Sequence, residues 1–313
     1  MIEALKALLF GIVEGITEWL PISSTGHMML LNQFMPLNVS DGFYATFLVV
    51  IQLGAIMAVV VLYFDRLNPF SRKKTADERR DTWDIWAKVV VGTIPAGIIG
   101  LLFDDLLEEK VMTNPDVAYI VVSVALIVYG IIFILMERIP AANGSLGRLA
   151  SRLFPAKVTG KHAVSRLSRP SGAKGTGEDA PIATFRDMGF GTAFAIGIFQ
   201  GLAVIPGTSR SGSIIIGSRL LGTTRTLAAE FAFFLAIPIM LGWSLVKLVK
   251  HGLAFTGAEW LVLAVGMVSA FAVSILVIRF LLAYVKRHDF GAFGIYRIVL
   301  AVLVLAWFGF IAA

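Results

Sequence analysis

Long apolar runs alternate with short polar connections along this chain. Six of the runs are long enough, or nearly long enough, to cross about 30 Å of hydrocarbon as a helix. They cover residues 43–64, 87–103, 116–136, 227–249, 260–284 and 292–312. The pattern therefore predicts an all-α polytopic membrane protein with six transmembrane helices.

Two further apolar regions, 2–36 and 185–222, have a different pattern. Each is interrupted in its middle by proline, glycine and hydroxyl residues, at 21–26 and at 206–212. These residues favour a turn over a continuous helix, and irregular backbone at membrane depth is tolerated only where it is buried in protein or lines a cavity. We expect two re-entrant helix hairpins. Two kinked helices that cross the membrane are the alternative.

The order of these segments is itself a repeat: hairpin, three spans, insert, hairpin, three spans. Glu14 and Gln200 are 186 positions apart, and each follows glycine, isoleucine and a hydrophobic residue and precedes glycine. Phe47 and Phe233 have the same separation. Because each half has three spans, the second half enters from the opposite side, which is the inverted-topology repeat of many transporters. The predicted units are a first inverted repeat (1–140), a cytoplasmic linker (141–181) and a second inverted repeat (182–313).

Composition supports membrane insertion and excludes several kinds of chemistry. Hydrophobic residues make up 57% and charged residues 15% of the 313 positions, whereas soluble domains carry roughly 25% charged residues. The net charge of +6 does not indicate nucleic acid, because the basic residues gather in two connections. The chain has no cysteine, so it has no disulfide, thiol nucleophile or thiolate metal site.

The charges of the connections predict an orientation. Connections 65–86 and 137–184 are rich in lysine and arginine, whereas connection 104–116 is acidic. Basic connections stay in the cytoplasm. We therefore expect both termini and the mouth of the first hairpin to face the outside, and the second hairpin to open to the cytoplasm.

Four ionisable residues lie in or beside the interrupted apolar regions: Glu14, Glu18, His27 and Arg210. A charge near the bilayer centre costs about 2.5–3.5 kcal/mol on insertion scales, so such residues usually mark a function. Glu14 and Glu18 share one helix face. Glycine pairs at the same spacing, 11 with 15 and 197 with 201, predict that the two hairpins cross closely and bring their turns together.

The two turns have the composition of an anion site. The hydroxyl and glycine residues that begin the second helix of each hairpin are Ser23, Ser24, Thr25 and Gly26 in the first and Thr208, Ser209, Ser211 and Gly212 in the second. Helix N-termini offer free N–H groups to an anion, and Arg210 adds a fork-shaped donor suited to a phosphate or diphosphate. Simple helix capping is the alternative explanation of these hydroxyls.

Two further expectations concern a proton and a cation. His27 lies one turn from Ser24, where it is expected to act as a general acid or base; a structural histidine is the alternative. Paired carboxylates without cysteine favour a hard divalent cation, Mg²⁺ or Ca²⁺, bound by Glu14 and Glu18. The carboxylate spacing alone is a weak signal for metal.

The motifs closely resemble those of the bacterial undecaprenyl-diphosphate phosphatases of the UppP/BacA type. The matching stretches are Glu-Gly-x-Thr-Glu-x-x-Pro-x-Ser-Ser-Thr-Gly-His at 14–27 and Pro-Gly-Thr-Ser-Arg-Ser-Gly at 206–212. The resemblance implies hydrolysis of undecaprenyl diphosphate to the monophosphate, which recycles the lipid carrier of peptidoglycan synthesis and confers bacitracin resistance. It also implies a divalent cation and a site at the outer face. The matching functional residues are Glu14, Glu18, Ser24, Thr25, His27, Ser209, Arg210 and Ser211.

Together these observations predict a phosphatase of the bacterial cytoplasmic (inner) membrane with its active site facing the periplasm. The expected catalytic residues are Glu18, Ser24, His27 and Arg210, and the expected substrate-binding residues are Ser23, Thr25, Gly26, Thr208, Ser209, Ser211 and Gly212. The expected partners are undecaprenyl diphosphate and membrane lipids, without nucleic acid, and a homo-oligomer stays open. Ser24 as nucleophile and direct attack by water are both open. The rival function is a lipid-phosphate flippase or small-solute transporter, because the repeat is a transporter plan.

Overall fold

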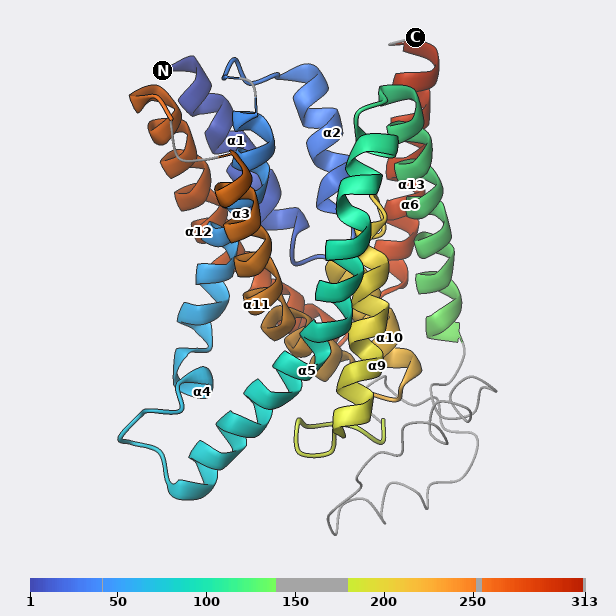
Figure 1. Cartoon of the computed structure of the whole chain (residues 1–313). Helices are drawn as coiled ribbons and strands as arrows, with labels where there is room; N and C mark the ends of the chain where they lie inside the picture. The colour runs from blue at the N-terminus through green and yellow to red at the C-terminus, as the bar shows by residue number, and fades with distance from the viewer. Residues whose placement is uncertain (41, 139–179, 252–254, 312–313) are drawn as a thin grey trace.

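The described part of the chain, residues 1–40, 42–138, 180–251 and 255–311 of a computed structural model, consists of helices and connections without a named strand. The first half contains α1 (Ile2–Thr17), α2 (Ser24–Phe34), α3 (Phe43–Leu62), α4 (Phe64–Leu67), α5 (Ala76–Leu107), η1 (Glu108–Met112) and α6 (Pro115–Arg138) (Figure 1). The second half contains α9 (Phe190–Gly201), η2 (Leu202–Val204), α10 (Arg210–Leu220), α11 (Arg225–His251), α12 (Gly257–Val285), α13 (Gly291–Ala306) and η3 (Trp307–Ile311).

Six of these helices are long and apolar enough to cross a membrane: α3, α5, α6, α11, α12 and α13. They overlap all six predicted spans, so the prediction of an all-α protein with six transmembrane helices is confirmed. Side chains in the core are mostly aromatic or aliphatic, whereas many large hydrophobic side chains on the outer faces are exposed. Exposed apolar surface of this kind is expected where lipid replaces water.

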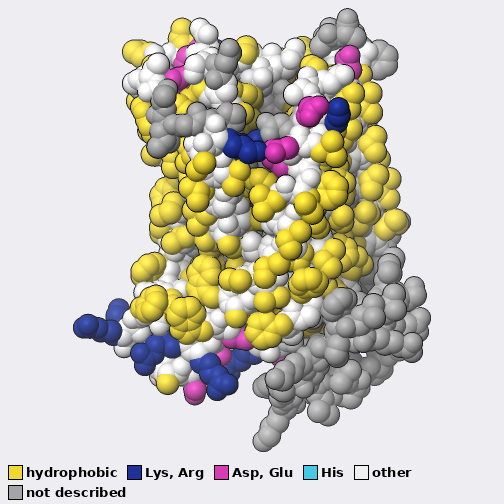
Figure 2. Space-filling model, in the orientation of Figure 1, with side chains coloured by type: hydrophobic (Ala, Val, Ile, Leu, Met, Phe, Trp, Pro, Cys, Tyr) yellow, Lys and Arg dark blue, Asp and Glu magenta, His cyan; other side chains and the backbone are white. Residues whose placement is uncertain are grey.

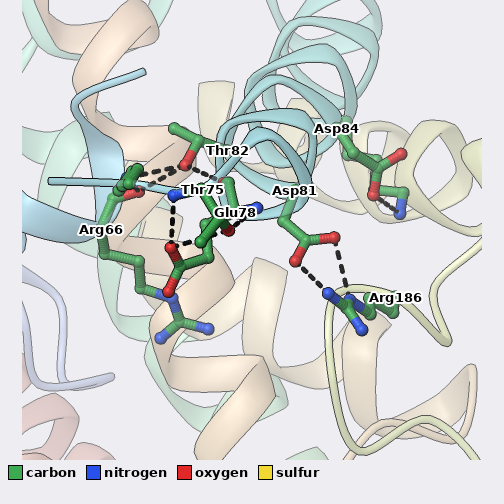
Figure 3. Close-up of polar contacts among 9 residues, drawn as sticks. Arg66, Thr75, Glu78, Asp81, Thr82, Asp84 and Arg186 are labelled. Carbon is green, nitrogen blue, oxygen red and sulfur yellow. Dashed lines mark hydrogen bonds and ion pairs between the residues drawn. The ribbon is translucent and has the colours of Figure 1, made fainter. Parts of the chain in front are cut away.

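The largest departure from the predicted spans is at the start of α5. The sequence pattern starts this span at residue 87, but the helix begins at Ala76. Thr75 and Glu78 form a capping box, in which the Thr75 N–H donates to Glu78 Oε2 at 2.7 Å and the Glu78 N–H donates to Thr75 Oγ1 at 3.2 Å (Figure 3). This reciprocal pairing satisfies the free N–H groups of a helix start. The helix therefore begins about three turns before the apolar stretch that the sequence pattern identified.

Charged side chains gather at the ends of the molecule. Figure 2 shows a band of hydrophobic side chains, with most of the lysine and arginine side chains at the end where Figure 1 places α4. At this end Asp81 accepts two hydrogen bonds from Arg186 (Figure 3). Lys88 donates to Asp84 and, at 2.7 Å, to the carbonyl oxygen of Phe185. Ion pairs therefore join α5 to the segment before α9.

Both interrupted apolar regions form two helices separated by a turn. α1 ends at Thr17 and α2 begins at Ser24, while α9 and η2 are separated from α10 by residues 205–209. In Figure 1, α1 and α2 lie in the half of the molecule that holds both termini, and α9 and α10 lie in the opposite half. The predicted breaks are therefore present at the predicted positions.

The glycine pairs of α1 and α9 contact long helices and not each other. A Cβ atom on Gly11 would lie 2.3 Å from the carbonyl oxygen of Gly266 in α12, and one on Gly197 would lie 2.2 Å from that of Gly92 in α5. α1 packs along α12, and α9 packs along α5. The expectation that these glycines let the two hairpins cross is wrong. The glycine surface of α1 is already covered by α12, and that of α9 is covered by α5. The predicted linker 141–181 lies outside the described residues except for its last two positions.

Candidate functional site

The first carboxylates of the site come from the last turn of α1. Glu14 and Glu18 are 1% and 7% exposed, and the Glu18 N–H donates to the Glu14 carbonyl oxygen at 3.0 Å. The neighbours of the Glu14 side chain include Glu18, Gln52 and Arg210. Helical spacing thus brings both carboxylates to one face, as the sequence predicts.

Glu18 joins the two halves of the chain. Its Oε2 accepts a hydrogen bond from Ser24 Oγ at 3.1 Å, and its Oε1 accepts one from Arg210 Nη2 at 2.8 Å. The Arg210 side chain is 13% exposed, so the pair is largely shielded from solvent. The predicted meeting of the two turns is confirmed, because a hydroxyl from one turn and a guanidinium from the other bind the same carboxylate.

The remaining hydroxyls of the second turn shape the backbone. Ser211 Oγ donates to the Glu18 carbonyl oxygen at 3.1 Å, which is a second link between the halves. Ser209 caps α10 by accepting from the Gly212 N–H at 3.2 Å. Thr208 Oγ1 donates to a carbonyl oxygen of its own turn, that of Ile205, at 2.8 Å. Capping and turn formation, the alternative explanation of these hydroxyls, therefore accounts for Thr208 and Ser209.

The two turns have the same unusual backbone at equivalent positions. Ser23 has φ 71° and Ser209 has φ 69°, and they are the only residues other than glycine with positive φ among the described residues. Each stands directly before the helix that follows its turn, α2 or α10. Positive φ is costly for a residue with a Cβ, so both turns store backbone strain next to Ser24 and Arg210.

A cavity of about 210 Å³ lies where the turns meet. Of the predicted site residues, those that line it are Glu18, Ser24, Thr25, Ser209 and Arg210. Sequence reasoning assigned no site role to other lining residues, among them Gln52, Gln200, Asp104 and Trp243. Pockets for drug-sized ligands measure roughly 300–1,000 Å³, so this cavity suits a small polar group.

The predicted residues that do not line the cavity are Glu14, Ser23, Gly26, His27, Thr208, Ser211 and Gly212. Gly26 faces α6 and α13, because a Cβ there would lie 3.4 Å from side-chain atoms of Leu126 and Leu300. A Cβ on Gly212 would lie 3.4 Å from Nη1 of Arg297. Both glycines therefore pack against neighbouring side chains and not against the cavity.

Both ring nitrogens of His27 have partners outside the carboxylate cluster. Its Nδ1 lies 2.7 Å from the Ser23 carbonyl oxygen, and its Nε2 lies 2.7 Å from the Tyr296 hydroxyl, whose ring stacks on the imidazole. A carbonyl oxygen only accepts, so Nδ1 carries the hydrogen in this geometry. Both ring nitrogens are therefore occupied by partners other than Ser24, and the proton-transfer role of His27 stays a prediction.

Arg297 is the principal residue that the sequence reasoning missed. It lies in α13, is fully buried, and donates to the carbonyl oxygen of Pro21 in the first turn and to those of Gly207 and Thr208 in the second. A signal was available: an ionisable residue inside a predicted span, 292–312, marks a function by the same rule that selected Arg210.

The residues that can hold a cation are the two carboxylates of α1. Glu14 Oε1 is buried and has no hydrogen-bond partner among the described residues, and Glu18 is its neighbour. No group of three or more His, Cys, Asp or Glu side chains suited to a metal is found in the described ranges. A hard cation that keeps several waters and binds through one or two carboxylates fits this donor set.

Known proteins match the chain over nearly its whole length. The model of the family described as "Bacitracin resistance protein BacA" matches residues 7–303. A Clostridioides difficile protein named "Undecaprenyl-diphosphatase 1" is 48% identical over 98% of this chain and 97% of its own length. "Undecaprenyl-diphosphatase" proteins of Acetivibrio thermocellus and Enterococcus faecalis are 48% and 46% identical, covering 98% and 97% of this chain and 98% and 96% of their own lengths. The resemblance drawn from the two motifs is therefore confirmed: the chain belongs to the BacA family of bacitracin resistance proteins.

Proposed function

We propose that this protein is an undecaprenyl-diphosphatase, which hydrolyses undecaprenyl diphosphate to undecaprenyl phosphate and inorganic phosphate. Family membership and the names of relatives at 46–48% identity support this activity. The structural observation that carries it is Glu18, which binds a serine hydroxyl on one oxygen and an arginine on the other at the wall of a small polar cavity. Recycling of the lipid carrier for peptidoglycan synthesis and resistance to bacitracin follow from the reaction.

The fold we propose is an inverted repeat with two re-entrant hairpins, α1–α2 and α9–α10, and with units 1–140 and 182–313 joined by a linker. Equivalent elements support it: α1 packs on α12 as α9 packs on α5. Ser23 and Ser209 are separated by 186 positions, the same interval as Glu14 and Gln200, and both have positive φ. Such repeats place the site where the interrupted helices meet.

We further propose that the chain resides in the bacterial cytoplasmic membrane and that its cavity opens to the periplasm. Asp104, near the end of α5, is among the lining residues, and the acidic η1 segment follows this helix. The basic residues around α4 and the start of α5 lie at the other end (Figures 1 and 2). Basic connections stay on the cytoplasmic side, which supports an outward-facing cavity.

In the proposed reaction Arg210 binds and neutralises the terminal phosphoryl group. Its planar fork suits phosphate oxygens, and the N–H groups at the start of α2 and α10 add donors. Phosphoryl transfer depends mainly on such positioning and charge stabilisation. Ser23, Thr25, Ser209 and Ser211 shape this anion site, and the isoprenoid chain extends into the membrane, since the cavity holds only the head group.

Two routes complete the hydrolysis. In the serine route, Ser24 Oγ forms a bond to the terminal phosphorus and transfers its proton to Glu18, while the bridging oxygen leaves on undecaprenyl phosphate. Water then cleaves the phosphoserine and releases inorganic phosphate. In the water route, a water molecule transfers its proton to Glu18 and attacks the terminal phosphorus directly, while the bridging oxygen leaves on undecaprenyl phosphate and inorganic phosphate is released. The 3.1 Å hydrogen bond from Ser24 to Glu18 is the arrangement of a nucleophile with its base and favours the serine route.

Glu14 and Glu18 would hold a divalent cation, Mg²⁺ or Ca²⁺. When bound, the cation supplies positive charge to the oxygens of the diphosphate, as in other phosphoryl transfers. Two carboxylates on one helix face, one with a buried oxygen that lacks a partner among the described residues, support this assignment.

The activity is tested with purified protein in detergent or nanodiscs. We expect phosphate release from undecaprenyl diphosphate by the wild type and by a control, Arg72→Ala, whose side chain lies in the basic connection outside the cavity. Absence of release from both, with uptake of lipid phosphate or a solute by proteoliposomes, would support the rival transport function.

A further inference from the structure

Arg297 holds the two turns of the site with one planar group. Its Nη1 donates to the Pro21 carbonyl oxygen at 3.1 Å, and its Nη2 donates to the Gly207 and Thr208 carbonyl oxygens at 2.8 and 2.9 Å. One nitrogen therefore binds the first turn and the other binds the second. Because guanidinium donors have a fixed geometry, the distance between these nitrogens sets the separation of the two turns.

The surroundings of Arg297 contain little else that balances its charge. The side chain is fully buried, and its partners among the described residues are three carbonyl oxygens and the face of the Tyr129 ring, 5.3 Å from Cζ. Burying a charge without a carboxylate partner is costly. Tyr129 also accepts a hydrogen bond from Ser213 Oγ at 3.1 Å, so α6, α10 and α13 enclose the guanidinium together.

The bonded carbonyls belong to residues that precede the reactive residues by two or three positions. Pro21 is three positions before Ser24, and Thr208 is two positions before Arg210. The Arg210–Glu18 contact of 2.8 Å spans the two turns, so it depends on their separation. A misplacement of about 1 Å in a reacting group can lower a rate about a hundredfold.

We propose that Arg297 is a positioning residue that fixes the separation of the two turns, so that Glu18, Ser24 and Arg210 face one phosphoryl group. The proposal rests on the proposed phosphatase function. Arg297 itself does not touch the cavity, since it is not among the lining residues.

The main variant is Arg297→Lys, because one ammonium keeps the charge but cannot donate to both turns in the same geometry. Arg219→Lys is the matched control. Arg219 is also a buried arginine on a helix of this region, and its Nη1 donates to the Thr223 carbonyl oxygen at 2.5 Å, at the opposite end of α10 from Arg210. Tyr129→Leu is a milder variant, which leaves every Arg297 donor in place and removes the aromatic face.

The first readout is the separation of the hairpins. Because the chain lacks cysteine, spin labels can be placed at Gln33→Cys on α2 and Leu202→Cys on η2, two exposed positions. Pulsed electron–electron double resonance should give a narrow distribution of the distance between the two labels in the otherwise unchanged protein and in Arg219→Lys. We expect a broader or shifted distribution in Arg297→Lys and a smaller change in Tyr129→Leu.

The second readout compares the effect of each variant on kcat with its effect on KM. We expect Arg297→Lys to lower kcat about 10–100-fold with KM within about threefold, because the lost interaction acts on transition-state geometry more than on lipid binding. Arg219→Lys should keep both values. Unchanged distances in both Arg297→Lys and Tyr129→Leu would overturn the proposal, as would normal kcat in Arg297→Lys. The distance readout needs no turnover, so failure of the phosphatase function would be seen separately, as a wild type that releases no phosphate.

Discussion

Arg210 donates to Glu18 at 2.8 Å although the two residues are 192 positions apart. The contact joins the last turn of α1 to the first residue of α10. Both side chains are largely buried, so each neutralises a charge that the surrounding protein cannot easily solvate. The proposed chemistry places the diphosphate at this pair.

Arg210→Ala and Glu18→Gln should each lower turnover at least about a hundredfold, because charge stabilisation dominates phosphoryl transfer. Phosphate release from undecaprenyl diphosphate by purified protein is the measurement. Removing one partner of a buried pair also destabilises by about 3–5 kcal/mol, so thermal unfolding is measured alongside. The exchanged pair, Glu18→Arg with Arg210→Glu, should recover part of the stability and none of the activity. Near-normal turnover in either single variant would contradict the assignment.

Ser24→Ala should abolish a phosphorylated intermediate. If Ser24 Oγ attacks phosphorus, acid quenching during turnover of a terminally labelled substrate should leave label on the wild-type protein and none on the alanine variant. Turnover should fall with it, since the nucleophile is lost. The water route predicts the opposite pattern: no label on the wild type and substantial activity in Ser24→Ala.

Glu14→Gln should weaken the proposed cation site. The substitution leaves the amide close to isosteric but removes one of two carboxylate charges, so the Mg²⁺ or Ca²⁺ concentration for half activation should rise at least about tenfold. Titration of thermal stability with the cation provides a readout without substrate. Full activity of the wild type after exhaustive chelation would exclude a role for the cation.

Substitutions of His27 can separate proton transfer from positioning. Its Nδ1 binds the carbonyl oxygen of the strained Ser23, next to Ser24. Asparagine places an N–H group near the position of Nδ1, whereas glutamine places one near that of Nε2. If His27 mainly positions the turn, His27→Asn should stay within about tenfold of wild-type turnover and His27→Gln should lose more. Equal loss in both variants, with Tyr296→Phe nearly normal, would support the role in proton transfer.

Gly197→Ala should destabilise the fold where α9 crosses α5. The new Cβ would lie 2.2 Å from the Gly92 carbonyl oxygen, and overpacking of this kind costs about 1–3 kcal/mol. Gly97→Ala is the matched control, because nothing lies within 4 Å of its Cβ position and alanine favours helix. Thermal unfolding in detergent should therefore move in opposite directions for the two variants. A neutral Gly197→Ala would show that the helices can separate without cost.

Local pattern predicted the features that depend on nearby residues. The six apolar helices, the breaks near residues 21 and 206 and the helix starts at Ser24 and Arg210 follow from apolar length and turn chemistry. The early start of α5 was missed although Thr75 and Glu78 carry the capping-box pattern, because apolar length alone was used to place that span.

Long-range contacts were harder to predict. The two turns meet at Glu18 and Arg210 as predicted, but the glycine pairs from which this meeting was predicted contact other helices. The contact partners of Gly11, Gly197 and His27 could not be predicted from the sequence, because a glycine surface or an imidazole ring can pack against several neighbours equally well. The position of Arg297 inside an apolar span marks it as a functional residue, but the carbonyl oxygens that it binds in both turns are visible only in the structure.

The backbone at Ser23 and Ser209 sets a limit on how this protein can evolve. Conformations with positive φ cost of order 1–3 kcal/mol at each such residue, and glycine at either position would relieve that cost. Stability alone would therefore select glycine twice. The presence of serine at both positions indicates that the hydroxyl groups are kept there although they lower the stability of the fold. Substitutions that raise thermal stability should therefore be sought elsewhere.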